Sequence, residues 1–283
     1  MIIFKLASQL YQYIQQQKTN GLSVGFVPTM GALHQGHISL INQSKSICNI
    51  TVCSIFVNPT QFNNAKDFEK YPITIEQDIY MLEMAKCDVL FLPSVDEIYP
   101  INSNKNKQYN LGFIETVFEG AYRPGHFNGV CMVVERLLNI ITPNKLFLGQ
   151  KDYQQCIVLK KLVVIMNVDM DVIICPTSRE KSGLAMSSRN RRLSDGVKEK
   201  ATIIYKSFNE IKQQITASNS LELIANAKQS LLKNGFDKID YLSFAKAETL
   251  TPIELWNGED SLVILAAAFI DEVRLIDNMV LKN

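Results

Sequence analysis

Short β-rich runs alternate with longer segments of helical periodicity over the first 176 residues, and this alternation limits the fold more than any other feature. Strands joined by helices of about ten or more residues pair in parallel, and the helices then cover the faces of the sheet. The expected strands are 22–27, 50–57, 89–92, 145–148 and 172–175, and the expected helices are 37–47, 74–86, 129–141 and 152–166. Thr74 and Gln77 have the spacing of a capping box at the start of the helix 74–86. The pattern therefore predicts an α/β fold with a Rossmann-like parallel sheet.

The composition changes after Pro176, where a basic segment interrupts this pattern. Residues 178–200 hold seven basic and three acidic side chains, so their local charge is seven minus three, +4, against +1 for the whole chain. The segments that follow predict two helices and three strands, at 195–216 and 220–233 and at 239–244, 262–270 and 273–276. We therefore expect two domains, a Rossmann-like domain over residues 1–177 and a smaller α+β domain over residues 178–283.

The charge balance and the apolar runs argue against two classes of partner. The chain has 29 Lys+Arg and 28 Asp+Glu, so it lacks the basic field that attracts nucleic acid or an anionic membrane. The longest apolar run, 262–270, is far shorter than the roughly 20 residues of a membrane-spanning helix. The short apolar start has no basic segment before it, so we expect no signal peptide. The six cysteines occur singly in apolar stretches, which predicts buried, reduced thiols in a cytoplasmic protein.

All three histidines, His34, His37 and His126, lie in glycine-containing segments, and two of them follow the first predicted strand. Residues 28–37 read P-T-M-G-A-L-H-Q-G-H. Ligands of a parallel sheet bind at the carboxyl ends of its strands, where helix N-termini offer N–H groups to anions. Two imidazoles there can donate hydrogen bonds to a phosphate whose charge grows during reaction. The alternatives are a helix-capping imidazole in a polar turn and a three-histidine zinc site, although no carboxylate has the H-E-x-x-H spacing.

Four further motifs follow this one in order. They are 54–62 (S-I-F-V-N-P-T-Q-F), 119–127 (E-G-A-Y-R-P-G-H-F), 147–155 (F-L-G-Q-K-D-Y-Q-Q) and 183–190 (G-L-A-M-S-S-R-N). The first motif alone resembles the HxGH nucleotidyltransferase superfamily. The five together resemble the pantothenate synthetase (pantoate–β-alanine ligase) family, whereas residues 195–283 resemble it mainly in length and pattern.

The resemblance implies an ATP-dependent ligase that works in two half-reactions. The carboxylate of pantoate attacks the α-phosphorus of ATP, which is bound with Mg²⁺, and gives pantoyl adenylate and pyrophosphate. The amine of β-alanine then displaces AMP and forms the amide bond of pantothenate, a precursor of coenzyme A. The family resemblance also implies a homodimer. We expect no protein-built metal site, and Asp78 is the one candidate ligand of the magnesium ion.

The resemblance also assigns roles to individual residues. The catalytic residues would be His37, His34, Lys151 and Arg189. ATP would be bound by Met30, Gly31, His34, Gly36, His37, Gly149, Lys151, Asp152, Ser178, Met186, Ser187, Ser188 and Arg189. Pantoate would be bound by Gln61, Gln155, Val130, Val133 and Val134, with Gln61 also near β-alanine. Neutral amides suit a substrate whose carboxylate loses its charge on adenylation. The C-terminal domain would act as a lid whose Ser-Ser-Arg segment grips pyrophosphate.

Each of these assignments has a structural alternative. Gln61 could stabilise the turn after Asn58-Pro59, the three valines fit an ordinary core face, and the Ser/Arg-rich segment could be a linker. Three positions depart from the family pattern, Ile73, Gln150 and Ser182, and none of them holds a proposed catalytic role. Two rival functions stay open at this point. They are another HxGH nucleotidyltransferase that releases pyrophosphate and stops, and a nucleotide-binding regulator without turnover.

Overall fold

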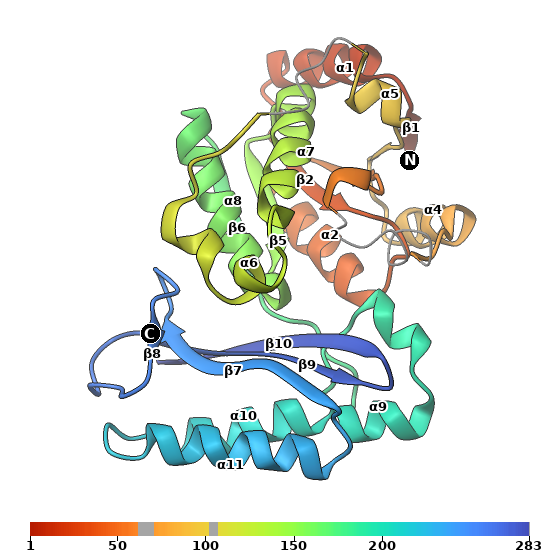
Figure 1. Cartoon of the computed structure of the whole chain (residues 1–283). Helices are drawn as coiled ribbons and strands as arrows, with labels where there is room; N and C mark the ends of the chain where they lie inside the picture. The colour runs from red at the N-terminus through yellow and green to blue at the C-terminus, as the bar shows by residue number, and fades with distance from the viewer. Residues whose placement is uncertain (62–70, 102–106, 283) are drawn as a thin grey trace. The chain divides into compact units, whose positions relative to one another are not determined.

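The computed structural model describes residues 1–61, 71–101 and 107–282. The chain forms two compact units (Figure 1). The first unit contains Met1–Gly149 and Val158–Pro176, and the second contains Gln150–Ile157 and Thr177–Asn283. Phe62, the last residue of the second sequence motif, lies outside the described residues.

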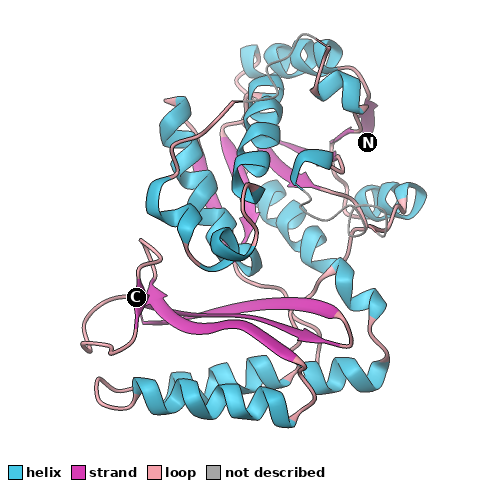
Figure 2. Ribbon diagram, viewed as in Figure 1, coloured by secondary structure: helices cyan, strands magenta, loops and turns pink. Residues whose placement is uncertain are grey.

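The first unit is built on a six-stranded sheet in which every strand pair is parallel, drawn in magenta in Figure 2. Its strands are β1 (Ile2–Phe4), β2 (Val24–Thr29), β3 (Ile50–Ile55), β4 (Val89–Phe91), β5 (Lys145–Gly149) and β6 (Asp171–Cys175). Their spatial order is β1-β4-β3-β2-β5-β6. The predicted α/β fold with a parallel sheet is therefore confirmed.

Helices bury the alternating apolar side chains of this sheet. The helical elements of the unit are α1 (Ala7–Thr19), α2 (Gln35–Ile47), η1 (Pro59–Gln61), α4 (Ile75–Met84), α5 (Val95–Ile98), η2 (Gly112–Thr116), α6 (Phe118–Tyr122), α7 (His126–Ile141) and part of α8 (Tyr153–Met166). Val27 and Cys53 of the sheet belong to one cluster with Leu40 of α2 and Leu82 of α4. Their sequence neighbours Phe26 and Val52 are also fully buried. Because successive side chains of a strand point to opposite faces, both faces of the sheet are covered.

Strand β2 occupies the position that matters most for ligand binding. It pairs with β3 on one side and with β5 on the other. Helix α2 connects β2 to β3 on one side, whereas α8 connects β5 to β6 on the other, so the connections on the two sides of β2 run in opposite directions. A parallel sheet binds ligands beyond the carboxyl ends of its strands at such a switch point. The carboxyl ends of β2 and β5, at Thr29 and Gly149, therefore mark the expected position of a site.

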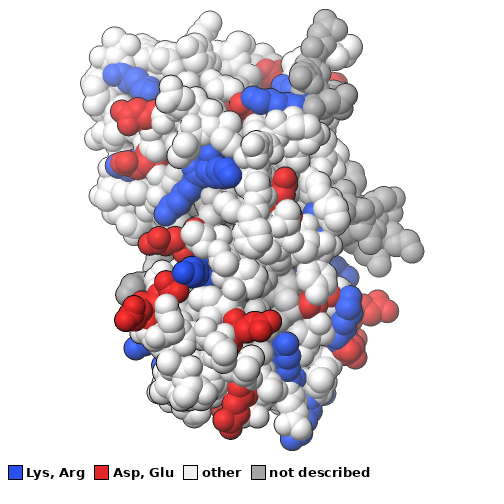
Figure 3. Space-filling model, turned by 60° about the vertical axis from the view of Figure 1, so that its left-hand side comes forward, with Lys and Arg blue, Asp and Glu red and all other residues white. Residues whose placement is uncertain are grey.

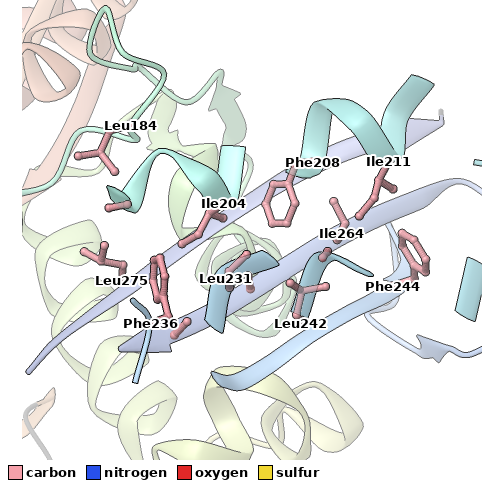
Figure 4. Packing of buried hydrophobic residues seen from close by; sticks show 14 of the residues in the cluster. Leu184, Ile204, Phe208, Ile211, Leu231, Phe236, Leu242, Phe244, Ile264 and Leu275 are labelled. Atoms are coloured by element: carbon pink, nitrogen blue, oxygen red, sulfur yellow. The ribbon is translucent and has the colours of Figure 1, made fainter. Parts of the chain in front are cut away.

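The second unit is a four-stranded antiparallel sheet with helices packed on it. Its strands, in the order β10-β9-β7-β8, are β7 (Lys238–Lys246), β8 (Pro252–Ile253), β9 (Leu262–Ile270) and β10 (Val273–Lys282). Its helical elements are η3 (Gln150–Asp152), η4 (Ser188–Arg192), α9 (Asp195–Ala201), α10 (Ile203–Gln214), α11 (Ser220–Lys233) and the start of α8. Phe208 of α10 and Leu231 of α11 share one core with Phe244 and Ile264 of the sheet (Figure 4).

Two local predictions were wrong. The helix expected over 195–216 is two helices, α9 and α10, which meet at Thr202. The Thr202 hydroxyl donates to the Glu199 carbonyl oxygen at 2.6 Å, and such back-bonding competes with the helical ladder. The capping box of Thr74 is absent too, because its side chain caps no backbone N–H and instead donates to Asp78.

Candidate active site

The two histidines of the first motif cap helix α2 together. His34 is the N-cap residue, and its Nδ1 accepts a hydrogen bond from the Gly36 backbone N–H at 3.1 Å. In return, Nδ1 of His37 accepts from the His34 backbone N–H at 3.2 Å. The ring centroids lie 4.1 Å apart. The helix-capping role that the sequence left as an alternative is therefore real, and both imidazoles are held at the first turn of α2.

This arrangement assigns the tautomer of both rings. A ring nitrogen that accepts from a backbone N–H carries a lone pair, so in each neutral imidazole the proton is on Nε2. Each histidine can therefore act as a hydrogen-bond donor through Nε2. Donors at a helix N-terminus, where the dipole is positive, suit a phosphate ligand. Capping and phosphate binding are thus compatible functions of the same two side chains.

A buried carboxylate shapes the turn that precedes these histidines. Asp78 of α4 is fully buried, and its two oxygens accept from the backbone N–H groups of Ala32 and Leu33 at 2.9 and 2.8 Å. The Thr74 hydroxyl donates to the same carboxylate at 3.0 Å. Gly31 and Ala32 have positive φ angles of 77° and 49°, a left-handed conformation that favours glycine. The hydrogen bond to Asp78 therefore helps to hold Ala32 in a backbone conformation that is unfavourable for a residue with a Cβ.

The candidate role of Asp78 as a magnesium ligand does not fit this geometry. Its carboxylate already accepts three hydrogen bonds and has no solvent exposure. Within the described ranges of the chain, the model contains no cluster of three or more His, Cys, Asp or Glu side chains that could hold a metal ion. Asp78 is a structural clamp, and the sequence signal for it was only a polar residue inside an otherwise amphipathic helix.

Gln61 is brought next to the histidine turn by three groups. Its side-chain amide nitrogen contacts the sulfur of Met30, and its amide oxygen lies 3.4 Å from the Asn58 amide nitrogen. Nδ1 of His126 lies 2.8 Å from the Gln61 backbone oxygen, which can only accept, so Nδ1 carries the proton. The third histidine therefore positions Gln61, and nothing about its local sequence distinguished this from a ligand role.

Helix α7 packs directly under Gln61 because of one glycine. A Cβ on Gly129 would lie 2.4 Å from the Thr60 carbonyl oxygen, so only glycine permits this contact between α7 and η1. Val130, Val133 and Val134 follow on α7 and are each 5% exposed or less. Their burial fits an ordinary core face. They also lie on the same helix that packs against η1 and Gln61.

Lys151 and Asp152 lie in the short helix η3, in the second unit. The Lys151 side chain is 16% exposed and forms an ion pair with Asp152 at 3.6 Å. Gly149, which precedes η3 at the end of β5, has open space where a Cβ would stand. Gln155 lies in the first turn of α8 and is half-buried. This segment is the third predicted ligand segment that begins at the carboxyl end of a strand.

The basic segment after Pro176 is an ordered turn with internal hydrogen bonds. The Met186 backbone N–H donates to the Ser178 carbonyl oxygen at 3.0 Å, and the Ser187 hydroxyl accepts from the Arg189 N–H at 3.3 Å. Ser188 and Arg189 form the start of η4 and are half-buried. The hydroxyls and the guanidinium of this motif are therefore presented from one short stretch of fixed backbone, which argues against a plain linker.

Charge on the molecular surface is mixed. On the face shown in Figure 3, basic and acidic side chains lie among one another, in agreement with a net charge of +1. In the part of the chain that the structure describes, no helix combines the length and the apolar character needed to cross a membrane. All six cysteines are buried, and none of them forms a disulfide.

Comparisons with known proteins agree with these observations. The family model described as Pantoate-beta-alanine ligase matches residues 2–280. A pantothenate synthetase from Cytophaga hutchinsonii is 45% identical over 283 residues, which cover 99% of both proteins. The crystal structure of pantothenate synthetase from Thermus thermophilus is similar over 100% of both chains, with a TM-score of 0.91 and 34% identity. A pantoate–β-alanine ligase from Francisella tularensis, complexed with beta-gamma ATP and β-alanine, has a TM-score of 0.81 and 41% identity over 99% of this chain and 98% of its own.

Proposed function

This chain belongs to the pantoate–β-alanine ligase family, and we propose which of its residues carry out the family's two half-reactions. It is a ligase that forms pantothenate from pantoate, β-alanine and ATP. The observation that carries the residue assignment is the pair of histidines capping α2, because it places two Nε2–H donors at a helix N-terminus.

The first half-reaction is adenylation of the pantoate carboxylate. A pantoate oxygen attacks the α-phosphorus, pyrophosphate leaves, and negative charge grows on the non-bridging oxygens in the transition state. His37 and His34 donate through Nε2 to those oxygens, and donors fixed before the reaction lower its barrier most effectively. Met30, Gly31 and Gly36 form the turn and first helical residues that approach ATP.

Pyrophosphate is held by cationic and hydroxyl groups of the second unit. Lys151 and Arg189 supply positive charge, and Ser187 and Ser188 supply hydroxyl donors. Gly149, Asp152, Ser178 and Met186 complete the ATP-binding set, with Asp152 suited to accept from the ribose hydroxyls. Mg²⁺ enters as part of the MgATP substrate.

Pantoate is bound by neutral amides and an apolar wall. Gln61 and Gln155 hydrogen-bond its hydroxyl and carboxyl oxygens, and Val130, Val133 and Val134 contact its methyl groups. Gln61 also contacts β-alanine, whose amine attacks the acyl carbon of pantoyl adenylate and releases AMP. The contact of Gln61 with Met30 supports this placement, because it brings the pantoate amide beside the ATP turn.

Two properties of the whole protein are proposed from other observations. The six buried cysteines, none of which forms a disulfide, support a cytoplasmic location, where thiols stay reduced. The family resemblance supports a homodimer, and light scattering after size-exclusion chromatography measures this directly, with a monomeric mass as the contradicting result.

The reaction is tested by mass detection of products from pantoate, β-alanine and MgATP. Equal amounts of pantothenate and AMP are expected. A nucleotidyltransferase that stops after the first step would release pyrophosphate without AMP or pantothenate. A nucleotide-binding regulator would release none of these three products.

The assignment of Arg189 is tested by the variant Arg189→Ala. This variant should slow single-turnover adenylation by at least about tenfold, which corresponds to 1.4 kcal/mol of barrier. Supplied pantoyl adenylate should still react with β-alanine at a near-normal rate.

A further inference from the structure

We propose that Asp277 and Asn278, two adjacent residues of β10, are positioning residues that hold both phosphate-binding segments of the second unit at once. We call this pair the β10 bracket. The inference rests on the proposed function, because it takes Lys151 and the Ser187–Arg189 stretch as phosphate ligands. The bracket lies more than eighty residues further along the chain than either segment.

Asn278 holds the backbone of the lysine segment. Its side-chain amide nitrogen donates to the carbonyl oxygens of Gln150 and Lys151 at 2.9 and 2.8 Å. Its amide oxygen lies 3.4 Å from the Gln150 side-chain nitrogen. Asn278 is only 3% exposed, so water cannot replace these bonds. Both N–H groups of one buried amide therefore fix two consecutive peptide units of η3.

Asp277 holds Arg179, which lies at the start of the segment that contains Ser187, Ser188 and Arg189. Its two oxygens accept from the two terminal nitrogens of Arg179 at 2.6 and 2.9 Å, a bidentate geometry. Arg179 also donates to the Gly183 carbonyl oxygen at 3.1 Å, and its guanidinium lies over the Tyr205 ring at 4.0 Å. Asp277 is 5% exposed. The carboxylate thus fixes an arginine that itself closes the turn.

Hydrogen bonds within residues 178–190 connect Arg179 to the proposed phosphate ligands. Arg179 and Ala185 form an antiparallel bridge, and the next residue, Met186, bonds back to Ser178. Asn190, which is buried, donates to the Ala185 carbonyl oxygen and to Glu180, both at 3.0 Å. The stretch from Ser187 to Arg189 is therefore anchored at both ends by groups that Arg179 and its neighbours hold.

The two halves of the bracket are joined through their own backbone. The Asn278 N–H donates to the Asp277 carboxylate at 2.8 Å. Adjacent side chains of a strand point to opposite faces, so the pair can reach two separate segments from one short piece of sheet. Neither residue carries a charge or donor that the proposed chemistry uses. Their effect on the reaction must act through Lys151 and Arg189.

The test uses the full-length enzyme and compares variants of the bracket and of its partner Arg179, together called the bracket variants, with a matched control. Asn278→Asp keeps the shape but replaces the donor with a carboxylate facing two carbonyl oxygens. Asp277→Asn and the milder Arg179→Lys weaken the bidentate pair. The control is Asp240→Asn, which disrupts another partly buried ion pair of the same sheet, where Asp240 accepts from Nε of Arg274 at 2.8 Å. Urea unfolding is measured for all four variants.

We expect the three bracket variants to raise the KM for ATP and slow single-turnover adenylation by about tenfold. Aminolysis of supplied pantoyl adenylate should change by less than about threefold, because that step has no pyrophosphate to hold. Asp240→Asn should lose stability but keep the wild-type KM for ATP. This split between the half-reactions is a readout that loss of stability alone does not produce.

Two results would overturn the inference in an enzyme whose wild type forms pantothenate and AMP. One is a KM for ATP within twofold of wild type in the folded bracket variants. The other is a rise in KM for Asp240→Asn as large as theirs, which would make the effect one of general sheet stability. Failure of the proposed function can be distinguished from failure of this inference, because the wild-type enzyme itself would then form no AMP.

Discussion

The substitution Asp78→Asn removes a charge from the centre of the turn that precedes the two histidines. The carboxylate now accepts three hydrogen bonds, from the backbone N–H groups of Ala32 and Leu33 and from the Thr74 hydroxyl. An asparagine of the same shape has one oxygen and one NH₂ group. Whichever way its amide is turned, the NH₂ group faces a backbone N–H, so one buried donor loses its partner.

The magnitude follows from that lost bond. An unsatisfied buried donor costs about 1–3 kcal/mol, and the remaining bonds lose the strength that a charged acceptor gives them. We expect the free energy of unfolding to fall by about 2–4 kcal/mol, against about 5–15 kcal/mol for a typical domain. Ala32 has a φ of 49°, which is unfavourable for a residue with a Cβ, so the turn should relax once its N–H is released. ATP affinity should therefore fall by about tenfold, or 1.4 kcal/mol.

The assay is calorimetric titration of ATP with and without Mg²⁺, alongside urea unfolding. A clamp on the turn predicts that Asp78→Asn weakens both forms of ATP equally. A magnesium ligand predicts that only MgATP binding is weakened. Thr74→Val is the matched control, since it removes one hydroxyl from the same carboxylate and leaves both backbone bonds, so it should cost only about 0.5–1.5 kcal/mol. Unchanged ATP affinity in a folded Asp78→Asn variant would refute the clamp.

Three other outcomes are expected. His37→Ala should lose about 10²–10³-fold in turnover, the scale of one oxyanion donor, with a smaller loss in ATP binding, and an unchanged adenylation rate would contradict its role. Gly129→Ala should push η1 away and weaken pantoate more than ATP in calorimetry, because the new Cβ meets the Thr60 oxygen at 2.4 Å; equal pantoate affinity would refute this. Burial raises the pKa of the Cys87 thiol to about 11, so the unfolded state releases this proton first and the free energy of unfolding should decline as pH rises from about 9 to 11. Cys87→Ala should show a shallower decline in urea unfolding between these pH values, and an identical slope would contradict the assignment.

The strands and helices of the parallel sheet were predictable because their apolar residues repeat with a clear period. The segment before residue 22 was not predicted, although it forms β1 and α1. Helix α1 buries only Leu10 and Ile14 and is otherwise rich in glutamine, so its periodicity is weak. Strand β1 is three residues long and stands at the edge of the sheet, where it pairs with β4. Both elements depend on contacts with distant parts of the chain.

In the candidate active site, too, some features could be predicted from the sequence and others depend on distant contacts. Local spacing is enough to place His34 and His37 at a helix start, and order along the chain is enough to recognise the five motifs. The protonated nitrogen of each ring depends on backbone N–H groups whose directions exist only once α2 has formed. His126 looked like a possible ligand, and its partner proved to be a backbone oxygen 65 residues away.

By itself, the sequence determined the α/β class and the family, because periodicity and motif order are properties of neighbouring residues. Only the tertiary structure decided that Asp78 is a clamp and that Asp277 and Asn278 hold two separate segments of the second unit. A carboxylate or an amide in a strand or helix looks the same in the sequence whether it meets water, a metal or a distant backbone N–H. Its role is set by burial and by which partner the fold brings within about 3 Å, where a hydrogen bond forms.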